Sequence, residues 1–176
     1  IVMCSLTEDQ AKLIIVMILD YLEKNHRNKI CSGAKRPTQN KIYLRNGSTV
    51  IARPVGNTGD AFRGFTADIL YIDEASRMSE LVWTASKPVL LKTKGEIWMS
   101  STPAGKQGYF WECYNKYKDD PNGRYKVIHK SSEEVIKSRP INKVWDEQRR
   151  KAALKLLEEE KAEMSALQYG QEYLGL

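Results

Sequence analysis

The sequence predicts an α/β domain in which a mostly parallel sheet is flanked by helices. Apolar segments at residues 1–6, 67–72 and 97–99 alternate with stretches of helical pattern, as in strand–helix–strand units. The last two of these segments end in polar clusters, which is typical of strands that carry a binding site in an open α/β sheet. The chain has 176 residues, 41% of them hydrophobic, which is enough for one domain with a core.

The N-terminal strand leads directly into a helix. Thr7 and Gln10 have the spacing of a capping box, which predicts that a helix begins here and covers residues 9–24. The middle of this helix is apolar on nearly every side. We therefore expect other elements to cover it on several faces.

The later elements continue the alternation. Asn46-Gly47 separates two β-like segments and predicts an antiparallel hairpin. The further expected elements are a helix over 78–91 weakened by Pro88, a helix over 109–118, a strand over 125–129, and a long charged helix over 142–167. The expected division is a core over residues 1–140 and a C-terminal helical segment over 141–176 that leads towards another domain.

Composition excludes several classes of protein. The longest apolar run, residues 13–19, is shorter than the roughly 20 residues that cross a bilayer, so no membrane span is expected. The N-terminus has no pattern of a secretion signal. Cys4, Cys31 and Cys113 include no Cys-x-x-Cys pair, which argues against a disulfide framework and a zinc site.

Positive charge is concentrated in residues 24–63. This segment has nine Lys and Arg side chains against a single acid, Asp60, although the whole chain has a net charge of only +6. Such a cluster is typical of contact with a polyphosphate. A solvated basic loop gives the same pattern, and both interpretations remain open.

Asp73-Glu74 directly follows the apolar strand at residues 69–72. In this position one carboxylate can hold Mg²⁺, and its neighbour can orient and deprotonate the water that attacks a γ-phosphate. We assign Asp73 to the metal and Glu74 to the water. The alternative is a strand that ends in an ordinary polar turn.

Ser100-Ser101-Thr102-Pro103 ends the next strand of the series. Adjacent parallel strands bring their carboxyl ends together, so these hydroxyls are expected beside Asp73 and Glu74. There they can hydrogen-bond the attacking water or the γ-phosphate. As isolated residues they would be a turn cap.

Taken together, these motifs resemble the ATPase domain of the large terminase subunit, the motor that packages DNA in tailed viruses. The matching residues are Asn46-Gly47-Ser48, Gly59, Arg63-Gly64, Asp68, Asp73-Glu74-Ala75, Ser100-Ser101-Thr102-Pro103 and Gly105, with a weaker match at Gln171-Glu172-Tyr173-Leu174. The resemblance covers nearly the whole chain and implies a RecA-like P-loop NTPase fold.

The resemblance also implies a role for each matching position. Asp73 corresponds to the Walker B aspartate that binds metal, and Glu74 to the catalytic glutamate. Ser100, Ser101 and Thr102 fall on the nucleotide-contacting motif that couples hydrolysis to movement. The implied cofactors are ATP and Mg²⁺.

Arg63 lies in the Arg-Gly element that some family members use as an arginine finger acting on a neighbouring subunit. A guanidinium in this role stabilises the charge on the transferring phosphate. The alternative is a loop arginine that touches DNA or solvent.

The chain departs from the family pattern in one respect. It contains no Gly-x-x-x-x-Gly-Lys-Ser/Thr motif, so the P-loop strand and its helix are expected to be missing from this piece and to belong to the same protein or to another chain. Their loss is expected to leave a gap beside the strand at residues 69–72. The chain alone is therefore expected to bind ATP poorly and to be inactive, and no nuclease carboxylate cluster is expected.

The implied function is ATP-driven translocation of double-stranded DNA into a procapsid. The implied partners are a portal protein, a small terminase subunit, further copies in a ring, and the nuclease domain of the same protein, in the cytoplasm of the host cell. One alternative is a degenerate, non-catalytic NTPase module for DNA binding or assembly. Another is a superfamily 2 helicase-like ATPase, which would need His or Asp where Ser76 stands.

Overall fold

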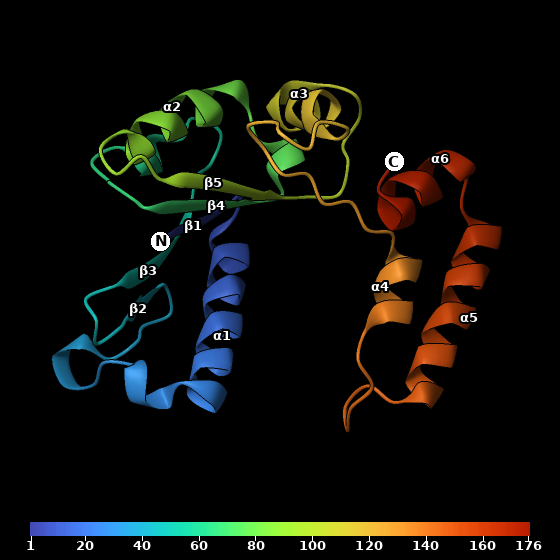
Figure 1. Ribbon diagram of the computed structural model, residues 1–176, viewed down its shortest axis with the longest axis horizontal. Coiled ribbons are helices and arrows are strands. Elements are labelled where there is room, and N and C mark those ends of the chain that lie inside the picture. Colours follow the sequence, from blue (N-terminus) through green and yellow to red (C-terminus); the bar gives the residue numbers. More distant parts are fainter. The chain divides into compact units, whose positions relative to one another are not determined.

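The computed structural model describes all residues from 1 to 176 and contains one five-stranded sheet (Figure 1). The strands are β1 (Val2–Ser5), β2 (Lys41–Tyr43), β3 (Thr49–Pro54), β4 (Ile69–Asp73) and β5 (Glu96–Ser100). The α-helices are α1 (Glu8–Asn25), α2 (Glu80–Leu91), α3 (Gly108–Tyr117), α4 (Ser132–Ser138), α5 (Glu147–Glu163) and α6 (Ala166–Tyr169). Short helical turns are η1 (Arg27–Lys29), η2 (Gly33–Lys35), η3 (Asp60–Phe62), η4 (Ala75–Arg77) and the π-helical η5 (Gly170–Leu174).

The sheet is parallel except at one edge. Its strand order is β2-β3-β1-β4-β5, with β2 and β3 antiparallel and every other neighbouring pair parallel. The hairpin turn lies at Asn46-Gly47, where the Leu44 amide donates to the Ser48 carbonyl and Gly47 has a φ of 87°. The mostly parallel sheet with an antiparallel hairpin is therefore confirmed.

The expected gap beside residues 69–72 is wrong. Strand β4 is paired on both sides, because Tyr71 lies opposite Met3 of β1 and opposite Trp98 of β5. The open edge is instead the outer edge of β5, which has β4 as its only neighbour. The backbone groups along that edge have no strand partner.

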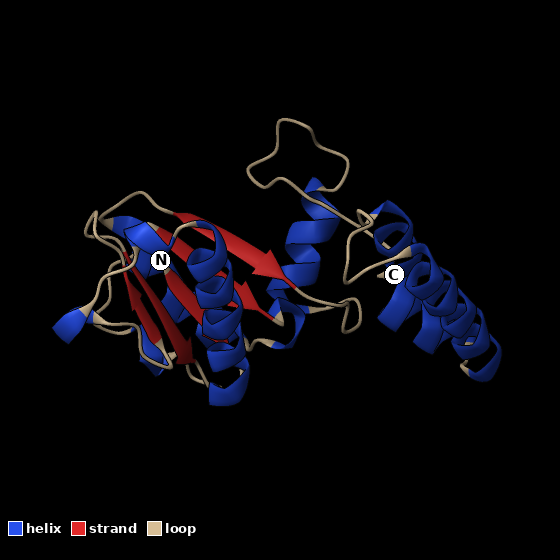
Figure 2. Ribbon diagram, turned by 90° about the horizontal axis from the view of Figure 1, so that it is seen from below, coloured by secondary structure: helices blue, strands red, loops and turns tan.

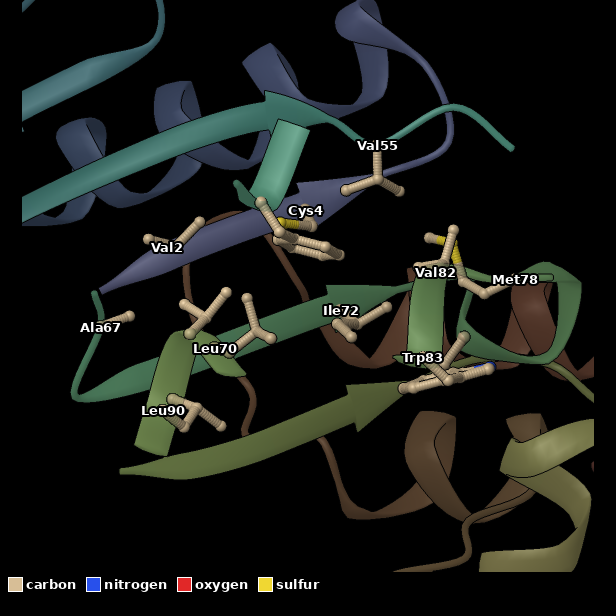
Figure 3. Close-up of a cluster of buried hydrophobic side chains, with 13 residues drawn as sticks. Val2, Cys4, Val55, Ala67, Leu70, Ile72, Met78, Val82, Trp83 and Leu90 are labelled. Carbon is tan, nitrogen blue, oxygen red and sulfur yellow. The ribbon is translucent and has the colours of Figure 1, made fainter. Parts of the chain in front are cut away.

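An apolar cluster fills each face of the sheet. Alternation along β4 places Leu70 and Ile72 in the cluster that includes Val82 and Trp83 of α2 (Figure 3). Tyr71 belongs to the opposite cluster, on the side of α1. The two helices therefore cover opposite faces of the sheet (Figure 1).

Helix α1 begins as the sequence predicts, since the Thr7 side chain accepts a hydrogen bond from the Gln10 amide. The helix packs against β1, β2 and β3 and leaves its other side open (Figure 2). The expected coverage on several faces is therefore wrong in this chain. The large apolar side chains of α1 that stay exposed are Leu13, Val16, Met17 and Tyr21.

The C-terminal third differs from the sequence prediction. Residues 125–129 form no strand, and the expected helix over 142–167 is divided into α5 and α6. The division has a local cause: the Ser165 side chain and Gln168 form a new capping box, which starts a second helix. Helix α4 was not expected, and it begins at a capping box of Ser131 and Glu134.

The chain divides into two compact units. The first comprises residues 1–101 and 108–110, and the second comprises residues 102–107 and 111–176. The expected division after residue 140 concerns domains of a longer protein and stays a prediction. None of the helices is long and apolar enough to span a bilayer.

Candidate functional site

The acidic pair lies at the carboxyl end of the parallel sheet. Asp73 is the last residue of β4 and pairs in register with Ser100, the last residue of β5. Because β4 and β5 are parallel neighbours, their carboxyl ends meet at the same edge. The first unit thus places a carboxylate and a hydroxyl side by side where two strands end.

A chain of hydrogen bonds ends on the Asp73 carboxylate. The Ser100 hydroxyl donates to Asp73 Oδ1 at 2.7 Å, and the Tyr71 hydroxyl lies 2.6 Å from Ser100 Oγ. A serine hydroxyl has one proton to donate and an ionised carboxylate only accepts, so the proton of the shorter bond comes from Tyr71. The direction is therefore from Tyr71 to Ser100 to Asp73.

Glu74 has a left-handed backbone, with φ 52° and ψ 41°. This conformation costs a residue other than glycine about 1 kcal/mol or more, and such strained positions cluster at functional sites. It ends β4 abruptly and starts η4, so the side chain leaves the line of the strand. Its carboxylate remains partly accessible, with 32% of the side chain exposed.

Two neighbours approach the Glu74 carboxylate. The Ser101 hydroxyl lies 3.5 Å from Glu74 Oε2, at the limit of a hydrogen bond, and Arg77 Nε lies 3.8 Å from the same oxygen. Ser101 is itself fixed by the Ser76 amide, which donates to its Oγ at 3.2 Å. Ser101 and Arg77 therefore limit the positions that this carboxylate can take.

Arg63 forms its ion pair with Asp60 and not with the acidic pair. Its Nε donates to Asp60 Oδ1 at 2.9 Å, 81% of its side chain is exposed, and no ion pair joins it to Asp73 or Glu74. Hydrogen bonds from Thr58 and then from Arg63 lower the pKa of Asp60. The arginine is thus displayed on the loop before β4 and does not belong to the cluster around Glu74.

Thr102 follows Ser101 directly but belongs to the second compact unit. Its expected place beside the acidic pair stays a prediction. Of the hydroxyl series, the first unit contains Ser100 and Ser101, each hydrogen-bonded to one member of the acidic pair.

Tyr71 and Arg77 were missed in the sequence. A signal for Tyr71 existed, since it lies two residues before Asp73 and alternation puts both side chains on one face of β4. No comparable signal marks Arg77, because its approach to Glu74 depends on the left-handed turn between them.

The comparisons with known proteins identify the family of this chain. A family model described as the terminase large subunit, T4-like virus type, N-terminal, matches residues 2–176. This chain belongs to that family. A comparison with curated protein sequences finds no match to this terminase chain.

Solved structures with the same fold are also terminases. The ATPase domain of the Thermus phage P74-26 large terminase has 19% identity and a TM-score of 0.63, with 99% of this chain and 74% of that one covered. The large terminase of a thermophilic bacteriophage in complex with ADP has 17% identity and a TM-score of 0.67, with 99% and 39% covered. The HK97 bacteriophage large terminase has 14% identity and a TM-score of 0.60, with 99% and 39% covered.

The present chain therefore spans about three quarters of the isolated ATPase domain and about two fifths of the longer terminases. At these identities the solved structures support the fold of the terminase chain, and they do so over nearly all of its length. The RecA-like α/β class expected from the sequence agrees with these neighbours.

A second feature of the terminase chain is a basic surface on the first unit. It is formed around the hairpin and the preceding turns by Arg27, Lys29, Lys35, Arg36, Lys41 and Arg45. The Arg45 amide donates to the Lys29 carbonyl, which joins η1 to the hairpin. None of these six cations forms an ion pair with an acid, although Arg45 Nε donates to the Ile30 carbonyl and Lys41 Nζ lies over the Tyr43 ring.

The donor set around Asp73 fits a metal site that phosphates and water complete. No group of three or more His, Cys, Asp or Glu residues is placed to hold an ion. Mg²⁺ in nucleotide sites needs only one or two carboxylates, because phosphates and water supply the other ligands. The Asp73 carboxylate, oriented by the Ser100 hydroxyl, matches this requirement.

Proposed function

We propose that this chain is the ATPase domain of a viral genome-packaging motor, coupling hydrolysis of Mg²⁺-ATP to translocation of double-stranded DNA. The observation that carries the proposal is the pairing of Asp73 with Ser100 and of Glu74 with Ser101 at adjacent parallel strand ends. Membership of the large terminase family supports it, as does the ADP bound to a relative of the same fold.

Each residue of the cluster has a distinct role in this proposal. Asp73 holds Mg²⁺, which when bound neutralises charge on the phosphates of ATP. Glu74 orients the attacking water and accepts its proton. Ser100, Ser101 and Thr102 contact the nucleotide and pass its state to the rest of the motor.

Arg63 acts in this proposal on the ATP of a neighbouring copy in a ring. Its exposure, and the absence of an ion pair with Asp73 or Glu74, support an action outside its own site. The Asp60 carboxylate holds the guanidinium until a γ-phosphate competes for it.

The phosphates of ATP need a P-loop to bind them. Residues 1–176 do not supply one, because the Gly-x-x-x-x-Gly-Lys-Ser/Thr (Walker A) motif is absent. We place the missing strand on the open outer edge of β5, since β4 has no free side. There its loop would lie beside Ser100 and Asp73. Residues 1–176 alone should therefore bind ATP poorly and turn over little.

The basic surface is proposed to contact the DNA backbone. Six unpaired cations release counterions when they neutralise phosphates, which gives affinity without sequence preference. A portal protein, a small terminase subunit and a nuclease domain complete the proposed motor in the host cytoplasm.

The decisive experiment is ATP turnover by the natural full-length protein. Glu74→Gln should lower turnover at least 100-fold, because it removes the base, and should leave ATP binding intact. Glu112→Gln, at an exposed glutamate of α3 with no ion pair, is the matched control. Normal turnover by Glu74→Gln would overturn the assigned role.

A non-catalytic NTPase module remains the second candidate, favoured by the absent Walker A motif. It predicts that the full-length protein binds DNA and shows no turnover at all. The same assay therefore separates the two candidates.

A further inference from the structure

Tyr71 occupies an unusual position on β4. It lies opposite Trp98 in the register of β4 and β5, and its side chain is on the same face as Asp73. Its hydroxyl reaches diagonally across the strand pair to Ser100, two residues beyond Trp98. Aromatic side chains are long enough for such diagonal contacts. The ring packs against the α1-side cluster, and the hydroxyl reaches Ser100.

We propose that Tyr71 is a positioning residue that fixes the Asp73 carboxylate through Ser100; this rests on the proposed role of Asp73 as the Mg²⁺ ligand. The Tyr71 hydroxyl donates to Ser100 Oγ and thereby commits the single Ser100 proton to Asp73 Oδ1. The chain of donors has only one consistent direction, which ends at the carboxylate.

Asp73 needs such a restraint because of its place in the chain. It is the last residue of β4, and the next residue already leaves the strand in a left-handed turn. The terminal torsion of an aspartate is broad, so the backbone alone leaves its oxygens free to rotate. A donor held on Oδ1 fixes the plane of the carboxylate. Outer hydrogen bonds of this kind orient metal ligands, and their loss typically lowers metal affinity or activity 10- to 100-fold.

Ser100 alone is a weaker restraint. A serine hydroxyl can rotate to donate its proton to different acceptors. Ser100 is held in the orientation that donates to Asp73 only while another group donates to Ser100 Oγ. Hydrogen bonds in series also strengthen one another. Removing the Tyr71 hydroxyl should therefore weaken the restraint on Asp73 even though the two residues share no direct bond.

A purely structural role for Tyr71 makes a different prediction. Its ring contributes to the α1-side cluster, and phenylalanine would fill the same space. Under that alternative, Tyr71→Phe would leave every property of the metal site unchanged. The hydroxyl can therefore be tested separately from the ring.

The test uses the full-length protein and a fluorescent ATP analogue, titrated with Mg²⁺ or held in EDTA. Tyr71→Phe should raise the Mg²⁺ concentration for half-maximal analogue binding about tenfold and leave binding in EDTA unchanged. Ser100→Ala should also raise the Mg²⁺ requirement and, because Ser100 is a proposed nucleotide contact as well, should weaken binding in EDTA. Ser100→Thr should keep the native Mg²⁺ requirement, and the double variant Tyr71→Phe/Ser100→Ala should need no more Mg²⁺ than Ser100→Ala. Tyr21→Phe, at an exposed tyrosine of α1, is the matched control.

Two results would overturn the proposal. One is an unchanged Mg²⁺ requirement in Tyr71→Phe. The other is equal weakening of analogue binding by Tyr71→Phe with and without Mg²⁺, which would indicate a general loss of structure. Asp73→Asn tests the underlying assignment independently: if it leaves the Mg²⁺ requirement intact, Asp73 is not the ligand and the proposed function fails at this residue. If only Tyr71→Phe is silent, the ligand role stands and the positioning role is wrong.

Discussion

At the scale of single residues, backbone geometry separates the two carboxylates of the acidic pair. The left-handed conformation of Glu74 turns the chain at the end of β4, and the carboxylates of Asp73 and Glu74 then have separate partners. The Ser100 hydroxyl donates to Asp73, and the Ser101 hydroxyl donates to Glu74. Two acids that are adjacent in the sequence can therefore have different environments. The proposed roles of metal ligand and base require such a difference.

Gly59 is a second residue with a left-handed backbone, and it also lies close to α2. It has a φ of 72°, and a Cβ placed on it would lie 2.9 Å from Ala85 Cβ of α2. Gly59→Ala should lower the free energy of unfolding by more than the roughly 1–2 kcal/mol expected for the left-handed backbone alone, because α2 must also move. Gly47→Ala is the matched control, with φ 87° and open space around it. Urea unfolding measures both, and equal losses would contradict the close approach.

At the scale of elements, α2 depends on one aromatic side chain. Trp83 is 1% exposed, packs against Tyr109 with ring centroids 4.7 Å apart, and has no partner for its buried Nε1. Trp83→Ala should cost about 3–5 kcal/mol of unfolding free energy, whereas Trp83→Phe should cost less, because it keeps a ring and removes the unpaired donor. Trp98→Ala, at an exposed tryptophan of β5, should cost little in the same denaturant titration. A loss for Trp83→Ala no larger than that for Trp98→Ala would contradict this account of the core.

The buried thiol of Cys4, on strand β1, makes the stability of the fold depend on pH. Burial raises the pKa of Cys4 from 9.0 to about 12. The folded state therefore holds this proton between about pH 9 and 12, where the unfolded chain releases it, so this contribution to stability is present below pH 9 and lost as pH rises. Cys4→Ala should flatten the decline of stability above pH 9, as measured by urea unfolding from pH 8 to 10.5. An unchanged pH dependence would contradict the burial of this thiol.

At the scale of the whole molecule, charge is distributed unevenly along the chain. The basic surface defined above contributes six unpaired cations, whereas the chain as a whole has a net charge of +6. A patch of this kind attracts a polyanion more strongly than the net charge alone implies.

The salt dependence of DNA binding tests this surface. Replacing Lys35 and Arg36 with Ala should reduce the slope of log K against log salt by roughly 2, if both contact phosphates. Replacing the exposed, unpaired Lys143 and Lys151 removes the same charge from α5 and the segment before it, and should change the slope little. Equal changes in the two double variants, measured by fluorescence anisotropy on duplex DNA, would show that only net charge matters.

Much of the fold follows from local patterns in the sequence. The Thr7 cap, the turn at Asn46-Gly47 and the apolar run before Asp73 each depend on a few neighbouring residues, so α1, the hairpin and β4 could be predicted. The division of the last helix at Ser165 was missed, because its apolar and charged pattern continues through the new cap.

Local patterns also locate the candidate site, since an acidic pair and a hydroxyl series each end an apolar strand. They predict that β5 lies beside β4, which the structure confirms, but they do not give the complete strand order, because hydrogen bonding between strands joins residues far apart in the chain. The pairing of β4 with both β1 and β5, the reach of Tyr71 to Ser100 and the open outer edge of β5 all depend on that strand order. The order follows from how the whole sheet buries its apolar surface, which is a property of long-range packing and not of any short segment.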